Sequence, residues 1–340
     1  MGGAIKLVSM TKAFIKDIAY YLPEKVVTNE DLVKEFPEWS VDKIAEKVGV
    51  NQRHVATDET ALDLALAAAE KLFSKGAVQK EDVDFILLCT QSPDYILPTS
   101  ACILQDRLGL STGTGALDFN LGCSGYEYGL ALAKGLVVSG VSKNVLLLTA
   151  ETYNKHLHPR DKGNRTIFGD GASATIVSSE GFAEIGEFVL GTKGKGAEYL
   201  MVKTGGSRYP EKSGEIEFVE GGNPKSPDYL FMDGQEIFMF TLMTVPKMIK
   251  QTLAKHELEK DQIDLFVFHQ ANKYMLDHLR NKLKIEEEKF FVNLGEVGNT
   301  VSSTIPIALA DAREQGKLKG NILIAGFGVG LSWGATILKV

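Results

Sequence analysis

The chain has 340 residues, more than one simple hydrophobic core usually holds, so we expect two packed domains or one large duplicated unit. Hydrophobic residues make up 44% and charged residues 24%, a composition that excludes disordered and fibrous classes. No apolar run approaches the ~20 residues of a membrane helix, and the opening segment is too short for a secretory signal, which predicts a cytoplasmic protein. A net charge of −7 argues against a protein built mainly to coat nucleic acid.

Short apolar or β-branched runs bounded by turn residues predict buried strands. They lie at Phe85–Cys89, Ala116–Phe119, Val145–Thr149, Ser173–Val177, Leu265–Phe268, Phe291–Val292, Ile322–Ala325 and Thr336–Leu338. Helix-like stretches alternate with them, at Ala61–Phe73, Gly125–Val138, Gln235–Leu253, Tyr274–Leu283 and Pro306–Gln315. This alternation predicts an α/β protein whose helices cover its sheets. Residues 192–227 have little periodicity and are expected to form loops and short strands.

Four segments of the first half recur in the same order in the second half. The stretch EDVDFILLCTQ resembles DQIDLFVFHQA, and DFNLGCSG around Cys123 resembles FVNLGEVGNT around Asn299. Two further pairs follow, KNVLLLTAE with GNILIAGFG and ASATIV with WGATIL. We interpret the pattern as one duplicated αβ unit, with halves at residues 1–178 and 179–340. Two such halves would pack about a pseudo-twofold axis and bring equivalent loops together.

Three polar residues lie on loops that the repeat predicts will converge: Cys123, His269 and Asn299. Cys123 is flanked by glycines directly ahead of a helix, where the helix dipole and free N–H groups stabilise a thiolate. His269 follows an apolar strand, and Asn299 lies in a Gly-Asn-Thr turn. Taken singly, each has a structural interpretation as a buried thiol, a hydrogen-bonded histidine, or a turn or cap residue. Together they favour nucleophilic thiol chemistry.

The remaining cysteines and a glycine run have simpler interpretations. Cys89 and Cys102 lie inside apolar runs and are expected in the core. The cysteines lack the paired spacing of a zinc site and HExxH is absent, so no metal site is expected. The run from Gly326 to Gly330 has GxGxG spacing and no acidic residue at the distance that a dinucleotide loop requires. It is better interpreted as a loop of backbone donors.

Longer blocks resemble the ketoacyl-acyl-carrier-protein synthase III family of the thiolase superfamily. They are YLPEKVVTNEDL from Tyr21, GCSGYEYGLALA around Cys123, RTIFGDGASAT from Arg165, HQAN from His269, GNTVSSTIPIAL from Gly298 and the ending GFGVGLSWGATIL. The blocks cover essentially the whole chain in the order of the family. The resemblance implies the thiolase fold, a five-layered α-β-α-β-α sandwich, and a homodimer.

The resemblance also implies a reaction, the decarboxylative Claisen condensation of a cysteine-bound acyl group with a malonyl thioester. Acyl-CoA would supply the acyl group, and an acyl carrier protein (ACP) would carry the malonyl group and receive the 3-oxoacyl product. The pathway would be fatty-acid initiation or a specialised lipid or polyketide route. No metal or organic cofactor is expected besides the thioester substrates.

Roles follow by position in the family. Cys123 is implied to be the nucleophile, while His269 and Asn299 hydrogen-bond the malonyl thioester oxygen as carbon dioxide leaves. The backbone N–H groups of Cys123 and Val329 are implied to form an oxyanion hole at the acyl carbon; family members usually have glycine at the second position. Phe327 is implied to lie near the nucleophile.

The substrate-binding positions of the family correspond to Trp39, Lys47, Lys162, Asn272 and Leu97. Trp39, Lys47 and Lys162 would bracket the nucleotide of coenzyme A, with lysine at two positions where arginine is usual. Lysine keeps the charge but loses the bidentate geometry for phosphate. Leu97 aligns with an aromatic residue that bounds the acyl pocket across the dimer interface.

The surface that would dock an acidic carrier protein is altered. Tyr274 and Met239 occupy positions where an arginine and a lysine are usual. The basic candidates that remain on the helix after HQAN are Lys273, Arg280 and Lys282. A solvated face without a docking role is the alternative interpretation. These changes are compatible with a specialised pathway enzyme as well as with the general initiator of fatty-acid synthesis.

Two other functions stay open from the residues. Acyl transfer to an oxygen or nitrogen acceptor, or non-decarboxylative condensation of CoA thioesters, needs an additional acid or base near the thiol. Glu127 and Glu296 are candidates by sequence, although a position inside the helix after Cys123 would allow Glu127 to point outward. A catalytically silent acyl-binding subunit is the third possibility, and the joint presence of Cys123, His269 and Asn299 argues against it.

Overall fold

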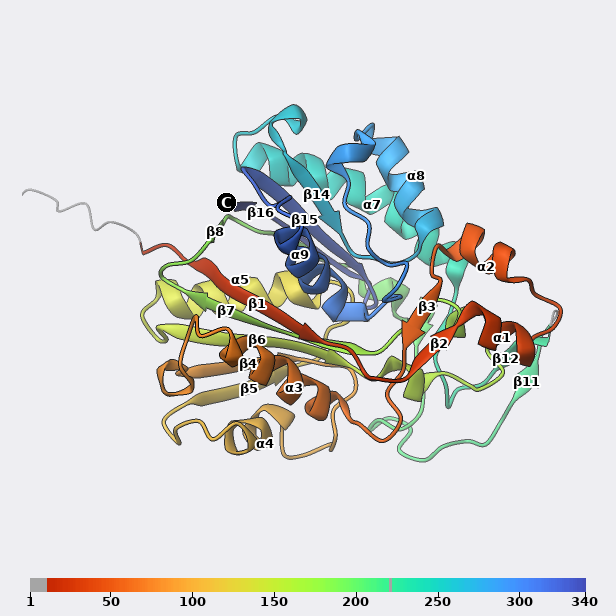
Figure 1. The fold of residues 1–340 in the computed structure, drawn as a ribbon. Helices are drawn as coiled ribbons and strands as arrows, with labels where there is room; N and C mark the ends of the chain where they lie inside the picture. Colours follow the sequence, from red (N-terminus) through yellow and green to blue (C-terminus); the bar gives the residue numbers. More distant parts are fainter. Residues whose placement is uncertain (1–10, 220–221) are drawn as a thin grey trace, which may run out of the picture.

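The computed structural model describes residues 11–219 and 222–340 as layers of sheets and helices (Figure 1). Within these residues, ten strands join in one hydrogen-bonded network. Its first group has the spatial order β5 (Gly115–Phe119), β4 (Phe85–Cys89), β6 (Asn144–Glu151), β7 (Gly171–Ser178) and β1 (Phe14–Tyr21). Strand β4 runs parallel to β5 and β6, whereas β7 is antiparallel to β6 and β1.

The second group of strands repeats this arrangement. Its members are β14 (Leu265–Phe268), β15 (Asn321–Gly328), β16 (Ser332–Lys339) and β9 (Val189–Thr192). Strand β14 is parallel to β15, and β16 is antiparallel to β15 and β9. A parallel bridge from Phe266 to Phe290 lies beside β14, where β5 lies beside β4 in the first group. The matching order supports a duplicated unit, and the boundary between residues 1–178 and 179–340 stays a prediction.

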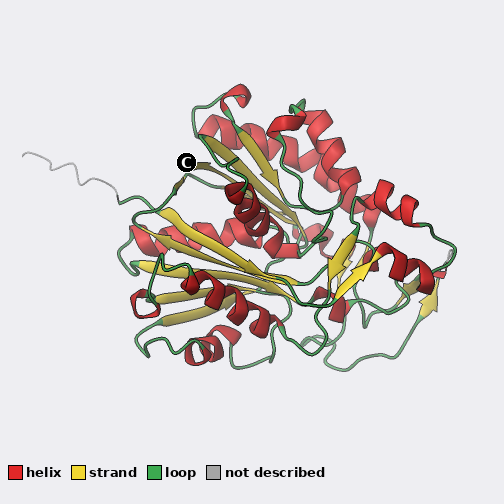
Figure 2. Ribbon diagram, viewed as in Figure 1, coloured by secondary structure: helices red, strands yellow, loops and turns green. Residues whose placement is uncertain are grey.

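Helices lie outside and between the two groups of strands (Figure 2). The central helices α5 (Gly125–Val138) and α9 (Thr304–Glu314) contact strands of both groups. On the outer faces lie α3 (Ala61–Ser74) and α4 (Ser100–Arg107) on the first group, and α7 (Gly234–Lys255) with α8 (Lys273–Leu283) beside it on the second. The order of layers is α-β-α-β-α, the thiolase-like fold that the resemblance implied.

Local sequence explains how tightly these layers pack. The β6 residues Leu146 and Leu148 face one side of the sheet and Leu147 the other, and all are almost fully buried, so the strand is apolar throughout. On α5, a Cβ at Gly129 would lie 2.5 Å from the Cδ1 atom of Leu147, a distance that real Cβ atoms do not reach. Glycine therefore lets the central helix approach the first sheet.

Shorter elements gather at one side of the molecule (Figure 1). Strand β2 (Val26–Thr28) pairs with β3 (Gln52–His54), next to α1 (Asn29–Glu35) and α2 (Val41–Val48). The connection from β6 to β7 contributes α6 (Lys162–Arg165). The long connection from β9 to β14 contributes β10 (Leu200–Met201), β11 (Glu217–Phe218), β12 (Pro224–Lys225) and β13 (Phe231–Met232). Strand β8 (Ala183–Ile185) pairs with both β1 and β16 and so joins the two groups.

Most expected elements are confirmed, α5 with the same bounds, but two predictions are wrong. Phe291–Val292 is not a strand, because its pairing with β14 is reduced to the single bridge at Phe290. Cys102 is exposed instead of buried, because α4 turns Ala101 and Leu104 inward and the intervening positions outward. Among the helices of residues 11–219 and 222–340, none is both long and apolar enough to cross a membrane.

Candidate active site

Cys123 lies between the end of β5 and the start of α5, with 8% of its surface exposed. A Cβ at Gly328, near the end of β15, would come within 2.8 Å of the Cys123 sulfur. A Cβ at Gly122 would come within 2.5 Å of Val329 and 2.6 Å of the Gln91 side chain. Glycine at these positions therefore allows the thiol to sit directly against β15 and the loop after it.

The electrostatic environment of Cys123 differs from the one expected at a helix start. Burial raises the pKa of the thiol to about 12, and the carboxyls of Glu151 and Glu127 also raise it. The backbone N–H groups of Val329 and of Cys123 itself act in the opposite direction, because they hydrogen-bond the sulfur. Desolvation outweighs these donors, so the free protein holds a neutral thiol and not a thiolate.

His269 follows β14, and its ring is almost completely buried. Its Nδ1 atom lies 2.7 Å from the hydroxyl of Thr304 at the start of α9. The ring packs edge-on against Phe327, with centroids 5.9 Å apart. Burial lowers the pKa of His269 to about 3, so the ring is neutral in the free protein.

Asn299 is held by both its backbone and its side chain. Its N–H donates to the carbonyl of Ile167 at 2.9 Å. Its Oδ1 accepts from the N–H of Val301 at 2.9 Å, and its Nδ2 donates to the carbonyl of Ala271 at 3.4 Å. The bond from the Val301 N–H fixes the orientation of the side-chain amide, because it requires Oδ1 to face Val301. The bond from Nδ2 to Ala271 is long, so the amide N–H groups are weakly occupied and available to a substrate oxygen.

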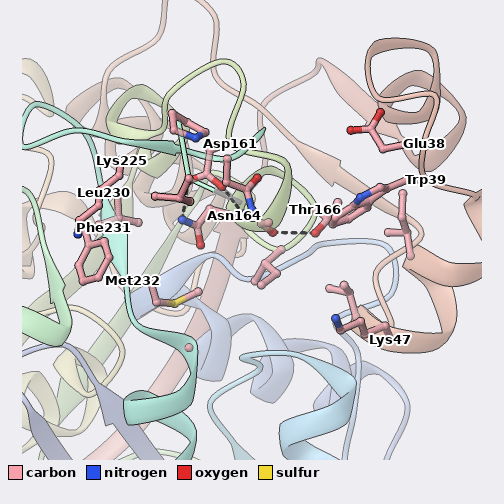
Figure 3. Close-up of a pocket in the computed structure, with 18 of the residues that line it drawn as sticks. Glu38, Trp39, Lys47, Asp161, Asn164, Thr166, Lys225, Leu230, Phe231 and Met232 are labelled. Atoms are coloured by element: carbon pink, nitrogen blue, oxygen red, sulfur yellow. Dashed lines mark hydrogen bonds between the residues drawn. The ribbon is translucent and has the colours of Figure 1, made fainter. Parts of the chain in front are cut away.

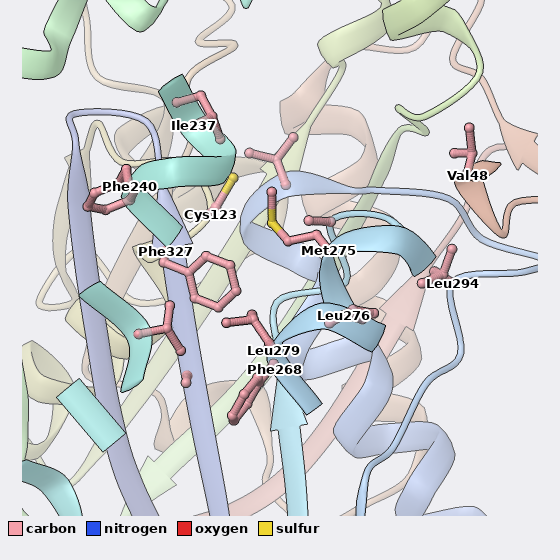
Figure 4. Packing of buried hydrophobic residues seen from close by; sticks show 14 of the residues in the cluster. Val48, Cys123, Ile237, Phe240, Phe268, Met275, Leu276, Leu279, Leu294 and Phe327 are labelled. Atoms are coloured by element: carbon pink, nitrogen blue, oxygen red, sulfur yellow. The ribbon is translucent and has the colours of Figure 1, made fainter. Parts of the chain in front are cut away.

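Shared neighbours bring the three predicted residues together. Gly328 lies against the Cys123 sulfur, and the preceding Phe327 lies against His269. Figure 4 shows Phe327 on the same side of the cluster as Cys123. The loop after His269 continues to Ala271, which receives the Asn299 amide. The three loops therefore meet at one end of the central layer, as the repeat predicted; their catalytic roles stay predictions.

A cavity of about 710 Å³ lies among α2, α6 and the β12–β13 segment (Figure 3). Helix α2 and the residues before it contribute Trp39 and Lys47, and the β12–β13 segment contributes Leu230 on the opposite side. Lys162 flanks the cavity, where it pairs with Glu38. Ile167 lines the cavity and its carbonyl accepts the backbone N–H of Asn299 at 2.9 Å, so this wall adjoins the centre.

Other predicted binding residues are placed less directly. The Asn272 side chain accepts the N–H of Met275 at 2.9 Å and so caps α8; substrate binding by this residue stays a prediction. Leu97 lies on the loop before α4 and is 80% exposed, so it is not buried in a pocket of its own chain. Lys273 pairs with Asp277 on the same helix at 2.5 Å.

The basic residues on α8 are partly neutralised. Arg280 lies 3.6 Å from Glu287, while Lys282 is exposed. Tyr274 is 52% exposed and packs on Phe238 with ring centroids 5.4 Å apart. This face therefore presents an aromatic surface next to basic side chains, with fewer free charges than the sequence suggests.

Sequence reasoning missed the polar wall behind Cys123. The Tyr153 hydroxyl donates to Gln91 at 3.0 Å. The buried Glu151 carboxyl accepts from the backbone of Gln91 and from the hydroxyls of Ser92 and Ser302. Burial raises the pKa of Glu151 to about 8. These residues follow β4 and β6 and precede α9, so only the sheet order brings them together, and no local motif marks them.

Glu127 points inward, although its helix position also allowed it to point outward. Its side chain is fully buried, packs against Gly326 on β15, and has no hydrogen-bond partner at either carboxyl oxygen among the described residues. Burial raises the pKa of Glu127 well above its usual range, so it is a neutral acid. It points inward because central helix α5 is covered by strands on both sides. No group of three or more potential ligand side chains in the described residues is arranged to hold a metal ion.

The layered α/β fold, with a glycine-flanked cysteine at the start of a central helix, defines a thiolase-like condensing enzyme. Residues 117–194 match the family described as 3-oxoacyl-[acyl-carrier-protein (ACP)] synthase III, and residues 253–340 match its C-terminal part. A beta-ketoacyl-[acyl-carrier-protein] synthase III of Clostridium perfringens is 36% identical over 97% of this chain and 100% of its own.

Solved structures agree. A crystal structure of a 3-oxoacyl-(acyl-carrier-protein) synthase III is 51% identical, with a TM-score of 0.95 over 97% of this chain and 100% of that one. A synthase from Burkholderia xenovorans LB400 is 38% identical, with a TM-score of 0.89 over 97% of this chain and 95% of that one. This chain belongs to the 3-oxoacyl-ACP synthase III family. It is a ketoacyl synthase and acyltransferase of the type that begins fatty-acid synthesis.

Proposed function

We propose that Cys123 accepts an acyl group from acyl-CoA and condenses it with malonyl-ACP to give 3-oxoacyl-ACP and carbon dioxide. The observation that carries this assignment is the setting of the Cys123 sulfur. It is buried at the start of α5, it lies against Gly328, and the N–H groups of Cys123 and Val329 hydrogen-bond it. After acylation, the same donors would be placed to stabilise the acyl oxygen as it becomes negative.

In the acylation half-reaction, the Cys123 sulfur attacks the thioester carbon of acyl-CoA. The new carbon–sulfur bond forms first and gives a tetrahedral intermediate; its collapse breaks the bond to the CoA sulfur, and the thiol proton ends on CoA. The tetrahedral intermediate carries its charge on the former carbonyl oxygen, where the N–H groups of Cys123 and Val329 would stabilise it. Because burial raises the pKa of the thiol to about 12, proton removal has to accompany the attack.

In the condensing half-reaction, the malonyl carboxylate leaves as carbon dioxide and its bonding pair forms a thioester enolate. His269 and Asn299 would hydrogen-bond the enolate oxygen, in keeping with the orientation of the Asn299 amide. The enolate carbon then attacks the acyl carbon, and the bond to the Cys123 sulfur breaks. The sulfur takes up one proton, so the half-reaction consumes a proton overall.

The cavity next to this centre fits the nucleotide end of coenzyme A. Trp39 offers an aromatic face, and Lys43 and Lys47 offer positive charge for phosphates. Asn223 lines the same cavity, and its side-chain oxygen is buried without a partner among the described residues, so it can accept a hydrogen bond from a base amine. Lys162 would contribute from the rim. The thioesters are substrates, and the proposal requires no resident cofactor.

For the malonyl carrier we propose docking on the outer face of α8 through Lys273, Arg280 and Lys282. Charge complementarity to an acidic carrier protein supports this site. The ion pairs of Lys273 with Asp277 and of Arg280 with Glu287 weaken the available charge. Docking would therefore depend on contacts with the exposed Tyr274 and Met239 as well. The cytoplasmic location of the enzyme stays a prediction.

A homodimer is also part of the proposal. Strand β5 is the last strand of the first group: it pairs with β4 on one edge, and no other described strand pairs with its second edge. Leu117 on β5 is exposed. Near it, Tyr95, Ile96 and Leu97 are 61%, 91% and 80% exposed, which is unusual for consecutive apolar side chains. A second copy seated on this face would cover them and extend the sheet. Leu97 would then reach the acyl pocket of the partner.

The test follows acyl mass on the intact protein. A panel of acyl-CoA thioesters should add acyl mass to the wild type and to Cys102→Ala, whose thiol is exposed on α4. Cys123→Ala should show no acyl adduct. Malonyl-ACP should then discharge the wild-type adduct with release of carbon dioxide. Acyl mass on Cys123→Ala would contradict the assignment, and discharge to an alcohol or amine without carbon dioxide would favour the acyl-transfer alternative.

A further inference from the structure

The ring of His269 has one polar partner among the described side chains, the hydroxyl of Thr304. The Nδ1 atom and the hydroxyl oxygen are 2.7 Å apart, and both residues are 2% exposed. The same hydroxyl lies 3.1 Å from the carbonyl oxygen of Val301. A threonine hydroxyl carries one hydrogen, so it can donate to the ring or to the carbonyl, but not to both.

The two arrangements differ in how many contacts they satisfy. If the hydroxyl donates to Nδ1, the oxygens of Thr304 and Val301 face each other without a hydrogen between them. If Nδ1–H donates to the hydroxyl and the hydroxyl donates to Val301, both contacts are hydrogen bonds that polarise each other. In a site without exposure to water, the second arrangement is favoured.

The carbonyl that ends this chain cannot easily turn away. Val301 has φ +57, a left-handed conformation that is unfavourable for a β-branched residue. It is held there by its N–H, which donates to the Asn299 side chain, and by its carbonyl, which also accepts the backbone N–H of Thr304. Strain retained beside catalytic groups is a common sign of a positioning role. The Val301 peptide thus connects the fixed amide of Asn299 to the hydroxyl that faces His269.

We propose that Thr304 is a positioning residue that keeps the proton of the neutral His269 ring on Nδ1. The Nε2 atom then carries a lone pair in the free enzyme. This inference rests on the proposed condensation, whose second half consumes one proton. Nε2 would take up that proton, which enters from solvent with the substrate, as negative charge develops on the enolate oxygen, because this charge offsets the desolvation that keeps the free ring neutral. The imidazolium N–H would then donate to the enolate oxygen. When the carbon–sulfur bond breaks, the proton passes to the Cys123 sulfur and Nε2 regains its lone pair.

The chain from Nδ1 through Thr304 to Val301 stays the same in every one of these states. A ring with its proton on Nε2 instead would have to take up a second proton at the buried Nδ1, which faces Thr304, or else become an anion, before it could protonate the sulfur. By fixing the tautomer, Thr304 would allow His269 to act as a proton donor as well as a hydrogen-bond donor. The required proton is then delivered from one nitrogen, Nε2.

The direct test is ¹⁵N NMR of the full-length enzyme labelled at histidine, with the His269 signals assigned by their loss in His269→Gln. In the wild type, the neutral ring should show a protonated Nδ1 and an unprotonated Nε2. Thr304→Ser should keep this pattern, because it retains the hydroxyl. Thr304→Val should lose it, with the proton moving to Nε2 in part or completely. A wild-type ring protonated at Nε2, or an unchanged tautomer in Thr304→Val, would overturn the proposal.

A kinetic split provides the second measurement. Thr304→Val should slow release of carbon dioxide from malonyl-ACP by the acyl-enzyme about tenfold or more, and Thr304→Ser should restore it. The matched control is Thr336→Val on β16, which removes a buried hydroxyl that has no hydrogen-bond partner in residues 11–219 and 222–340 and lies outside the site. It should leave both the tautomer and the rate unchanged. Equal losses in Thr336→Val and Thr304→Val would show a general packing effect and overturn the assignment.

Failure of this inference and failure of the proposed function are distinguishable. A wild-type protein that takes no acyl group or releases no carbon dioxide contradicts the proposed function. The NMR measurement on the free enzyme still decides the tautomer in that case, because it requires no substrate.

Discussion

The two central helices, α5 and α9, occupy corresponding places in the two halves of the fold but begin in different ways. The turn before α5 carries Cys123 between glycines and relies on close approach to β15. The turn before α9 carries Asn299 and the strained Val301 and relies on side-chain hydrogen bonds. A nucleophile needs open space at its sulfur, whereas an amide donor needs a fixed orientation, and each turn supplies the property that its residue requires.

The serines at the starts of these helices join the halves. Ser124, ahead of α5, lies 2.5 Å from the hydroxyl of Ser332 on β16. Ser303, ahead of α9, lies 2.8 Å from the hydroxyl of Thr149 on β6. Each central helix is therefore bonded at its start to the sheet of the other half. These two connections fix the position of each turn relative to the other half. A site assembled from both halves requires this, because its residues must keep constant distances from one another.

Among the variants that distinguish the roles of the two turns, Asn299→Ala is expected to have the largest effect on activity. The change removes the donor to the substrate oxygen and the acceptor that holds Val301, so the condensing step should fall about 100-fold. Acylation of Cys123 should persist, because the α5 turn is not altered. The measurement pairs acyl mass with carbon dioxide release from malonyl-ACP. Equal loss of both steps would show that the two turns do not act separately.

A stability test examines the close approach of α5. Gly129→Ala places a Cβ 2.5 Å from Leu147 and should destabilise the fold by about 1–3 kcal/mol. The matched control is Gly135→Ala on the same helix, where no atom lies within 4 Å of the new Cβ. It should stabilise by roughly 0.5–1 kcal/mol through helix propensity. Urea denaturation of both variants measures the difference, and equal stabilities would contradict the packing argument.

A smaller effect is expected from pH, because buried carboxyls lie behind the α5 turn. Burial raises the pKa of Glu127 well above its usual range, of Glu151 to about 8 and of Asp170 to about 6. These groups hold protons more tightly in the folded than in the unfolded state. Stability from them is therefore present below the unfolded pKa values and is lost as pH rises through the folded ones.

The melting temperature should accordingly fall between pH 5.5 and pH 8. Glu127→Gln removes one of these groups without changing its size and should make the fall shallower. The exposed Glu288→Gln is the matched control and should leave the profile unchanged. A wild-type melting temperature that rises over this range would contradict the protonation states assigned to the buried carboxyls.

The amino-acid sequence by itself determined the strand and helix pattern, the repeat and the three residues at the centre. Apolar runs fix which segments are buried, and the glycines around Cys123 indicate a sharp turn before a helix, so these features are local. The sequence also identified Cys102 as buried, which was wrong, because the direction of a side chain on α4 depends on where the helix packs.

Only the tertiary structure decided the charge states and the surroundings of the centre. Gln91 lies on the loop after β4, Glu151 ends β6 and Thr304 begins α9, and nothing in their local sequence relates them to Cys123. The sheet order brings Gln91 and Glu151 to the wall behind the thiol, and α9 carries Thr304 to His269. Burial then reverses the expected thiolate at Cys123 into a neutral thiol, since desolvation depends on every layer that covers the group.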